Sequence, residues 1–364
     1  MNIPDREVFA IYGTDIADMT VRLLQAASLS SRIRSRRARI AIKPNLVLAS
    51  PAQYGATTHP EICEGTIRYL QAEGFSNLVV AEGAWIGDRT PQAAGVCGYT
   101  TLCKQYGVAF IDTQKEPSRM KDCAGMPLHI CACVETFDYI INLPVLKGHC
   151  QTKMTCALKN MKGFIPDGEK RRFHTMGLHK PIAHLNAGIR QDFILVDAIC
   201  GDLDFEEGGN PLRRDMLLGC FDPVLCDAYC AGLLGYEACE IPYIGYAEAL
   251  HAGDGNLMSM RYNELNRPAA VPAFSRSRHV SALSRYIRDR EACSACFAGL
   301  VQALRRLEAE GRLQTLRDIV AVGQGYKGET GMLGMGRCTR GFQASVPGCP
   351  PTAAAAYAFL RDFT

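Results

Sequence analysis

Short apolar runs alternate with amphipathic stretches along roughly the first 240 residues of the chain. Runs such as EVFAIYG (7–13) and NLVVAEG (77–83) are brief and almost wholly apolar, as strands buried on both faces are. Stretches such as HPEICEGTIRYLQAEG (59–74) have apolar residues at helical spacing and end at a glycine. Strands are predicted at 7–13, 39–48, 77–83, 108–113, 137–147 and 192–200, helices at 17–29, 59–74 and 90–107, and a strand entering a helix at 216–236.

Strands and helices that alternate in this order form a mostly parallel sheet with helices on both faces. We therefore predict an α/β domain over residues 1–256. Residues 257–290 are weakly patterned and rich in Arg, Ser, Asn and Pro, so they are predicted to be a connector. A helix at 291–311, a strand at 318–325 and a final alanine-rich helix predict a small C-terminal α/β unit over 291–364.

Composition and charge narrow the classes of partner. The 364 residues carry a net charge of only +3. The basic run RIRSRRAR (32–39) leads straight into a predicted strand, so we interpret it as a solvent-exposed segment before that strand. The sequence lacks the interleaved aromatic and basic residues that are typical of nucleic-acid-binding surfaces, so no nucleic-acid partner is predicted. The N-terminal residues MNIPDREVFAIYG lack the pattern of a secretory signal, and no apolar run reaches about 18 residues. A cytoplasmic protein without a membrane partner is predicted.

Four of the 17 cysteines have a pattern typical of metal ligands. Cys293 and Cys296 form a C-x-x-C at the start of a predicted helix, Cys338 lies in a loop, and Cys349 lies in the rigid sequence GCPP before the last helix. Thiolates at such junctions, close to free backbone amides and with a proline after the last ligand, favour an iron–sulfur cluster. One [4Fe-4S] cluster is predicted, which makes the C-terminal unit a cysteine-ligated iron–sulfur unit. A zinc site and unrelated buried thiols are the alternatives.

A polar, histidine-rich and weakly periodic segment follows the strand that ends in NLPVLK (142–147). Its first residues lie at the carboxyl edge of the sheet, where open α/β folds bind ligands. Lysine and histidine side chains gathered there predict a pocket for a small carboxylate or phosphate, whereas a solvated basic loop is the alternative. The predicted catalytic residues are Lys147, His149 and Lys159. The predicted substrate-binding residues are Lys43, Asn45, Thr58, His59, Lys153, Asn160 and Lys162, with Thr58 also expected to cap the helix that follows it.

Several of these motifs resemble one family. IKPNLV, TTHP, LPVLKGH, LKNMKG and VDAI followed by G-x-P together resemble the DUF362 domain family, over roughly residues 38 to 240. Members are often described as iron–sulfur cluster-binding proteins, so the resemblance strengthens the predicted fold and cluster. Many relatives carry a ferredoxin-like insert with two C-x-x-C-x-x-C-x-x-x-C-P runs, which this chain lacks. The resemblance implies no particular reaction.

The favoured hypothesis is a cytoplasmic iron–sulfur oxidoreductase that acts on a small anionic substrate, with a ferredoxin-like protein as a candidate redox partner. Three alternatives remain open. The protein could be a non-catalytic electron carrier or redox sensor that docks an acidic partner. The cluster could act as a Lewis acid in a lyase or dehydratase. The four cysteines could instead hold zinc in a binding module.

Overall fold

The computed structural model describes residues 6–203, 211–267 and 279–364. Residues 268–278 of the predicted connector therefore lie outside the described residues. The chain divides into two compact units. The first contains residues 1–149, 154–170 and 182–275, and the second contains residues 150–153, 171–181 and 276–364. Two short stretches from the middle of the sequence thus belong to the same unit as the C-terminal residues.

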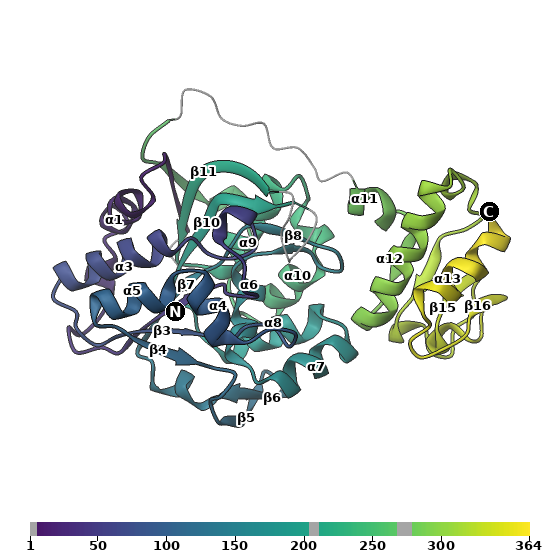
Figure 1. The fold of residues 1–364 in the computed structure, drawn as a ribbon, viewed down its shortest axis with the longest axis horizontal. Helices are drawn as coiled ribbons and strands as arrows, with labels where there is room; N and C mark the ends of the chain where they lie inside the picture. The colour runs from purple at the N-terminus through teal and green to yellow at the C-terminus, as the bar shows by residue number, and fades with distance from the viewer. Residues whose placement is uncertain (1–5, 204–210, 268–278) are drawn as a thin grey trace. The chain divides into compact units, whose positions relative to one another are not determined.

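The first unit is built on one large sheet (Figure 1). Only β11 runs antiparallel to both of its neighbours, and the remaining adjacent pairs are parallel. The predicted α/β fold with a mostly parallel sheet is confirmed. The strands lie in the order β12 (Arg261–Glu264), β1 (Glu7–Tyr12), β11 (Pro211–Cys220), β10 (Phe193–Asp202), β7 (Tyr139–Leu143), β2 (Ile40–Pro44), β3 (Leu78–Glu82) and β4 (Ala109–Asp112).

Helices cover both faces of this sheet, as predicted (Figure 1). On one face α1 (Ile16–Ala26), α3 (Pro60–Ala72) and α5 (Tyr99–Tyr106) enclose the main hydrophobic core with the strands. The other face carries α6 (Ala157–Asn160), α9 (Pro223–Leu233) and α10 (Pro242–Ala249). The single helix predicted at 90–107 is wrong. It is two helices, α4 (Thr90–Val96) and α5, because Gly98 between them has a positive φ of 83° that breaks the helical backbone.

The segment after β7 contains more regular structure than its weak periodicity predicts. It holds two short strands, β8 (Lys147–His149) and β9 (Lys153–Thr155), and two helices, α7 (Asp167–Met176) and α8 (His179–Gly188). A separate hairpin of β5 (Ser118–Cys123) and β6 (Met126–Cys131) precedes β7. Many polar side chains of this segment are buried, so local hydrophobic periodicity could not reveal the helices.

The second unit has its own sheet and core. Its four parallel strands follow one another in chain order, β13 (Ile287–Asp289), β14 (Val320–Val322), β15 (Leu333–Met335) and β16 (Ala344–Val346). The helices are α11 (His279–Ser284), α12 (Ser294–Ala309) and α13 (Ala353–Leu360). The apolar face of α12 packs on this sheet and on α13 through Leu300, Leu304, Val320, Leu333 and Leu360.

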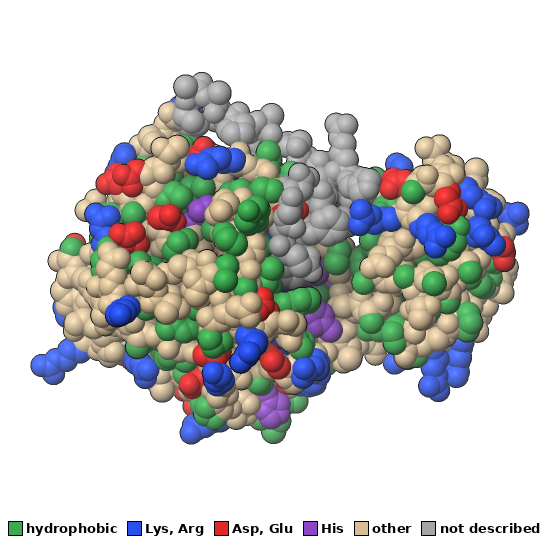
Figure 2. All heavy atoms as spheres, in the orientation of Figure 1, with side chains coloured by type: hydrophobic (Ala, Val, Ile, Leu, Met, Phe, Trp, Pro, Cys, Tyr) green, Lys and Arg blue, Asp and Glu red, His purple; other side chains and the backbone are tan. Residues whose placement is uncertain are grey.

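The face of the first unit that Figure 2 shows carries mixed charges. On the face of the first unit in Figure 2, Lys and Arg side chains are interspersed with Asp and Glu, as the small net charge implies. Within residues 6–203, 211–267 and 279–364, no helix has both the length and the apolar character that a membrane crossing requires.

Candidate functional site

The four predicted cluster ligands follow the carboxyl ends of strands in the four-stranded sheet. Because the strands are parallel and in register, Asp289, Val322, Met335 and Val346 form one row across the sheet. Cys293 and Cys296 lie after β13, at the start of α12. The other two predicted ligands follow the next strands of the sheet, Cys338 after β15 and Cys349 after the edge strand β16. The topology therefore directs all four thiols to the same edge.

Cys293 and Cys296 are in direct contact. Cys293 is the N-cap residue of α12, and its Sγ lies 3.5 Å from the Sγ of Cys296. The first amides of a helix lack intrahelical partners, so they are free to donate to sulfur. Hydrogen bonds from the Cys296 thiol and from backbone amides, together with the charge of Lys327, lower the pKa of Cys293 to about 6. The same contact raises the pKa of Cys296, which indicates one shared proton.

The Cys338 and Cys349 thiols belong to the same electrostatic group. The Cys338 and Cys349 thiols interact electrostatically with Cys296 and raise its pKa. Burial raises the pKa of Cys338 itself. Backbone hydrogen bonds join the two loops, because Arg337 N donates to Gly348 O over 2.8 Å. Gly336 has a φ of 86°, and a Cβ there would lie 3.6 Å from the Cys296 Sγ. Glycine is favoured here because it adopts this left-handed conformation without strain, in a turn that lies beside the thiols.

Polar side chains of the second unit surround the start of α12. His174 Nδ1 lies 2.7 Å from the Ser294 hydroxyl, which donates to Gln151 Oε1 over 2.5 Å. Gln151 Nε2 donates to Ala292 O over 2.8 Å, so residues 150–153 and 171–181 fix the backbone beside Cys293. The Asp289 carboxylate accepts from Ala292 N, and burial raises its pKa to about 6. A group of this kind exchanges a proton near neutral pH.

The large sheet of the first unit has a second polar edge. Lys43 is the penultimate residue of β2, Glu82 is the last residue of β3, and the two side chains form a fully buried ion pair. Burial lowers the pKa of Lys43 and raises the pKa of Glu82, and each partner's charge opposes the other's shift. Gly163 faces this pair, and a Cβ there would lie 2.7 Å from Lys43 Nζ. The LKNMKG motif therefore lies against the ends of β2 and β3.

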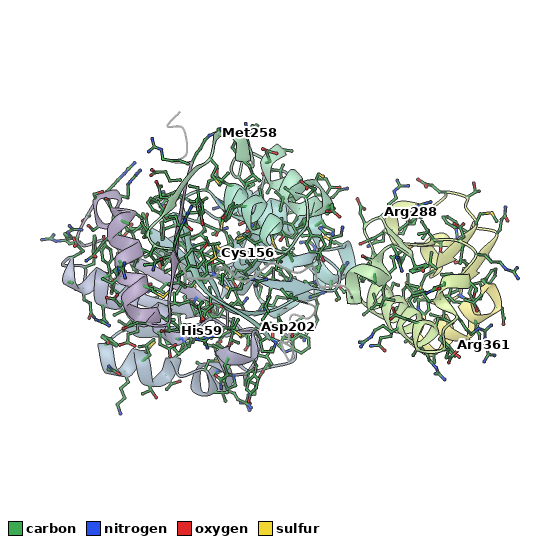
Figure 3. The ribbon with its side chains drawn as sticks, turned by 90° about the horizontal axis from the view of Figure 1, so that it is seen from above. His59, Cys156, Asp202, Met258, Arg288 and Arg361 are labelled. Atoms are coloured by element: carbon green, nitrogen blue, oxygen red, sulfur yellow. The ribbon has the colours of Figure 1, made fainter. Side chains whose placement is uncertain are left out.

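Asn45, Thr58 and His59 are brought together beside this edge. The prediction that Thr58 caps α3 is wrong, since the N-cap residue is His59. The Thr58 hydroxyl instead accepts from Asn45 N and donates to Leu143 O, which ties β2 to β7. His59 Nδ1 lies 2.8 Å from Asp197 Oδ2 (His59 is labelled in Figure 3). Burial opposes protonation of His59, but the Asp197 carboxylate outweighs it and raises the pKa of His59.

The predicted catalytic residues are buried. Lys147 Nζ donates to Ala56 O over 2.6 Å, and Lys159 Nζ donates to Thr155 Oγ1 over 3.2 Å. His149 is also buried. The solvated-loop alternative does not describe these three side chains.

The remaining predicted substrate-binding residues lie in different places. Asn160 Nδ2 donates to Asn142 Oδ1 over 2.7 Å and to Pro44 O, which places it at the same sheet edge. Lys162 is half-buried in the turn after α6. Lys153 belongs to the second unit, whereas the other predicted substrate-binding residues belong to the first.

Sequence reasoning did not single out several residues with a role in these sites. Glu82 had a readable signal, since an acidic residue that ends an apolar strand mirrors Lys43 in β2. Ser294 and Gln151 had none, because both are ordinary polar residues far apart in the sequence. The third omission is a group of three buried thiols in the first unit, Cys156, Cys226 and Cys230, whose sulfur atoms lie within 4.8 Å of one another and could hold a metal ion. Hydrogen bonds from the Cys156 and Cys226 thiols lower the pKa of Cys230 to about 6.

Comparisons with known proteins locate this chain among distant relatives. A family model described as "Domain of unknown function (DUF362)" matches residues 40–232. A thylakoid-associated protein of Synechocystis sp. is 23% identical over 226 residues, which cover 58% of this chain and 68% of that protein.

Two solved structures have a more remote likeness. The lactate racemase apoprotein of Thermoanaerobacterium thermosaccharolyticum is 15% identical with a TM-score of 0.40, and a protein of Thermotoga maritima is 12% identical with a TM-score of 0.36. Each match covers 66% of this chain but only 60% and 59% of the respective solved chain, which is less than two thirds.

Proposed function

The chain belongs to the DUF362 family, whose model matches residues 40–232, and from this premise we propose that it is an iron–sulfur oxidoreductase. Its single [4Fe-4S] cluster is held by Cys293, Cys296, Cys338 and Cys349, and its substrate is a small carboxylate or phosphate. The observation that supports the proposal is the placement of all four cysteines after the carboxyl ends of strands in one parallel sheet, where their thiols interact electrostatically.

The donor set fits an iron–sulfur cluster. Four thiolates are the usual ligands, and amide donors around the sulfurs stabilise the negative charge of the cage. The Cys293 thiol is already acidic, with a pKa lowered to about 6 mainly by the Cys296 thiol, and the Lys327 ammonium supplies a positive charge beside Cys293 and Cys338. A cluster bound there would exchange single electrons. Cys349 is exposed, so an electron could pass from this edge to a docked redox partner.

Residues around the cysteines support proton transfer to accompany electron transfer. The Asp289 carboxylate, with a pKa raised by burial to about 6, holds or releases a proton beside Cys293. His174 and Ser294 form a hydrogen-bonded pair next to the same turn. The Asp289 carboxylate would take up or release its proton as the redox state changes, which would keep the local charge constant.

The substrate pocket of the proposal lies at the carboxyl edge of the large sheet. Lys147 and Lys159 are buried cations there, and an electrostatic attraction is stronger inside a protein than in water. His149 would supply acid–base chemistry, and Lys43, Asn45, Thr58, His59, Asn160 and Lys162 would bind and orient the anion. Lys153 and the ferredoxin-like partner stay predictions from the sequence. A cytoplasmic location also stays a prediction, because the Synechocystis relative is thylakoid-associated.

The cluster is tested by purifying the full chain without oxygen and measuring iron, acid-labile sulfide and the EPR spectrum before and after reduction. We expect about four irons and four sulfides per chain. Cys349→Ser should lower the iron content or change the EPR spectrum. The matched control is Cys239→Ser, because Cys239 is also exposed but lies in another part of the chain. A colourless protein that contains only zinc, or equal spectra for Cys349→Ser and wild type, would overturn the assignment.

The anion pocket is tested by calorimetry with acetate and inorganic phosphate. We compare wild type with a Lys147→Met, Lys159→Met variant, in which methionine keeps most of the side-chain volume. Lys115→Met is the control, since Lys115 is an exposed lysine near the same sheet. The proposal expects at least a tenfold weaker affinity in the double variant and no change in the control. Equal affinities in all three proteins would show that the anion binds elsewhere.

A further inference from the structure

The first unit contains a second thiol group that the proposed function does not use. Cys156, Cys226 and Cys230 are completely or almost completely buried, and their sulfur atoms all lie within 4.8 Å of one another. Cys156 lies in the interior of the first unit (Figure 3). Cys63, Cys97, Cys103 and Cys200, by contrast, lie among apolar side chains of the main hydrophobic core, as free thiols usually do. Three sulfurs with a common centre are a different arrangement.

The fold constructs this group from two elements. Asp222 caps α9 and Pro223 begins it, so the helix starts at a fixed residue and turns Cys226 and Cys230, one turn apart, to the same side. Cys156 immediately precedes α6, which packs against α9. The carboxylate of Asp227, which lies between the two helix cysteines, accepts from Ala157 N over 2.7 Å.

A second hydrogen bond strengthens the same connection. Asp227 also accepts from Leu158 N over 3.2 Å, so both carboxylate oxygens hold the chain that follows Cys156. The carboxylate and its two amides are fully buried, where such bonds are hard to break. The position of Cys156 relative to α9 is therefore fixed before any metal binds.

A fourth thiol and a positive charge lie next to the group. Cys220, at the end of β11, is buried, its thiol donates to Asp222 O over 3.3 Å, and it interacts electrostatically with the Cys226 thiol. The guanidinium of Arg214, also on β11, interacts electrostatically with Cys230. A buried cation of this kind offsets the negative charge that thiolate ligands would bring into the core.

We propose that Cys156, Cys226 and Cys230 form a structural zinc site that joins α9 to the segment before α6, with the neighbouring Cys220 thiol of β11 as its fourth ligand. Zinc prefers four tetrahedral thiolates at about 2.3 Å, which places the sulfurs about 3.8 Å apart. The three central sulfurs already satisfy that spacing within the 4.8 Å limit. Zinc has no redox chemistry and the site leaves no open position, so its role is to stabilise the fold. This site is independent of the C-terminal cluster.

The test uses the full chain with Cys293, Cys296, Cys338 and Cys349 all changed to serine, so that only the proposed zinc site can bind through several thiols. The protein is loaded with Zn²⁺ or Co²⁺ under reducing conditions and dialysed. We expect one metal ion per chain, an intense sulfur-to-cobalt charge-transfer absorption, and an X-ray absorption shell of sulfur at about 2.3 Å. Less than about 0.2 metal ions per chain, or a shell of nitrogen and oxygen only, would overturn the site.

Single substitutions then locate the metal. Cys230→Ser, made in the same background, should abolish at least nine-tenths of the cobalt absorption. The control is Cys63→Ser, because Cys63 is a fully buried thiol on α3 outside the group. If Cys230→Ser does not fold, as judged by circular dichroism, the absorption spectrum of the parent protein still decides the matter. Equal metal loss in Cys230→Ser and Cys63→Ser contradicts the proposal. Iron content of the wild-type chain is measured separately, so failure of the zinc site and failure of the cluster are distinguishable.

Discussion

The buried pair of Lys43 and Glu82 gives the sharpest test of the first unit. Glu82→Gln keeps the shape of the side chain and an acceptor for the Leu46 amide, but it removes the charge that faces Lys43. Lys43→Met removes the opposite charge. Each single variant leaves one charge in the core without its partner, which costs far more than the loss of an exposed ion pair.

The magnitude follows from the cost of neutralising the group that is left. In Glu82→Gln the folded protein can avoid an unpaired buried charge by releasing the proton of Lys43, whose ordinary pKa is 10.5. At pH 7 that costs about 5 kcal/mol, at about 1.4 kcal/mol per pH unit. In Lys43→Met the folded protein can avoid the unpaired charge by protonating Glu82, whose ordinary pKa is 4.5. Protonating this carboxylate at pH 7 costs about 3 kcal/mol. Both values agree with the about 3–5 kcal/mol typical of a broken buried pair.

The two variants must respond to pH in opposite directions. In Glu82→Gln the pKa of the folded-state lysine is depressed, so the unfolded chain binds more protons and stability rises with pH. The free energy of unfolding that Glu82→Gln loses relative to wild type should therefore fall to about 2 kcal/mol at pH 9. In Lys43→Met the pKa of the folded-state carboxyl is raised, so stability falls as pH rises and the deficit should be only about 1 kcal/mol at pH 5.5.

Urea unfolding at pH 5.5, 7 and 9, followed by circular dichroism, measures these free energies. The double variant Lys43→Met, Glu82→Gln is the internal control, because it removes both charges and should recover most of the stability lost by either change. Parallel pH profiles for the two single variants, or a loss below about 1 kcal/mol in Glu82→Gln at pH 7, would refute the reasoning.

Three further predictions concern other parts of the first unit. Asp197→Asn should lower the pKa of His59, which NMR titration measures. The variant should also lack the part of the stability that wild type loses as pH rises through the raised pKa of His59. An unchanged titration would contradict the role assigned to Asp197. Asp222→Ala should cost about 1–2 kcal/mol in urea unfolding, since the carboxylate caps α9; an unchanged midpoint would show that the cap contributes nothing. Gly65→Ala should destabilise by about 1–3 kcal/mol because its Cβ would lie 2.6 Å from the backbone of α1, whereas Gly95→Ala, in open space, should stabilise by about 0.5–1 kcal/mol; the same sign for both would contradict the close packing.

The alternation of apolar runs and helical stretches was sufficient to predict the large sheet. Strands such as β2 and β3 are buried on both faces, so every residue apart from Lys43 in β2 and Glu82 in β3 is apolar, and the pattern is easy to read. The helices α7 and α8 were not foreseen, because their buried faces include polar side chains such as Glu169 and Asn186 that local periodicity treats as exposed. The break at Gly98 depends on a backbone angle that a glycine permits but does not require.

The candidate sites were predictable only where the spacing is local. Cys293 and Cys296 lie one turn apart, so their contact could be foreseen from the C-x-x-C pattern. Cys156 approaches Cys226 and Cys230 through the packing of α6 on α9, across about 70 residues of sequence. No spacing rule covers such a distance. Lys43 and Glu82 meet because β2 and β3 are adjacent parallel strands, a relation that appears only once the strand order is known.

The second unit combines segments that are far apart in the sequence, which has a consequence for synthesis on the ribosome. Residues 150–153 and 171–181 belong to the unit completed by residues 276–364. At about 5–20 residues per second, roughly 5–20 s pass between the emergence of residue 181 and that of residue 276. During that interval the first two stretches are made, but the residues that they contact at the start of α12 are not. The second unit therefore cannot fold in step with the growing chain, and its thiol edge can be assembled only after residue 349 has been translated.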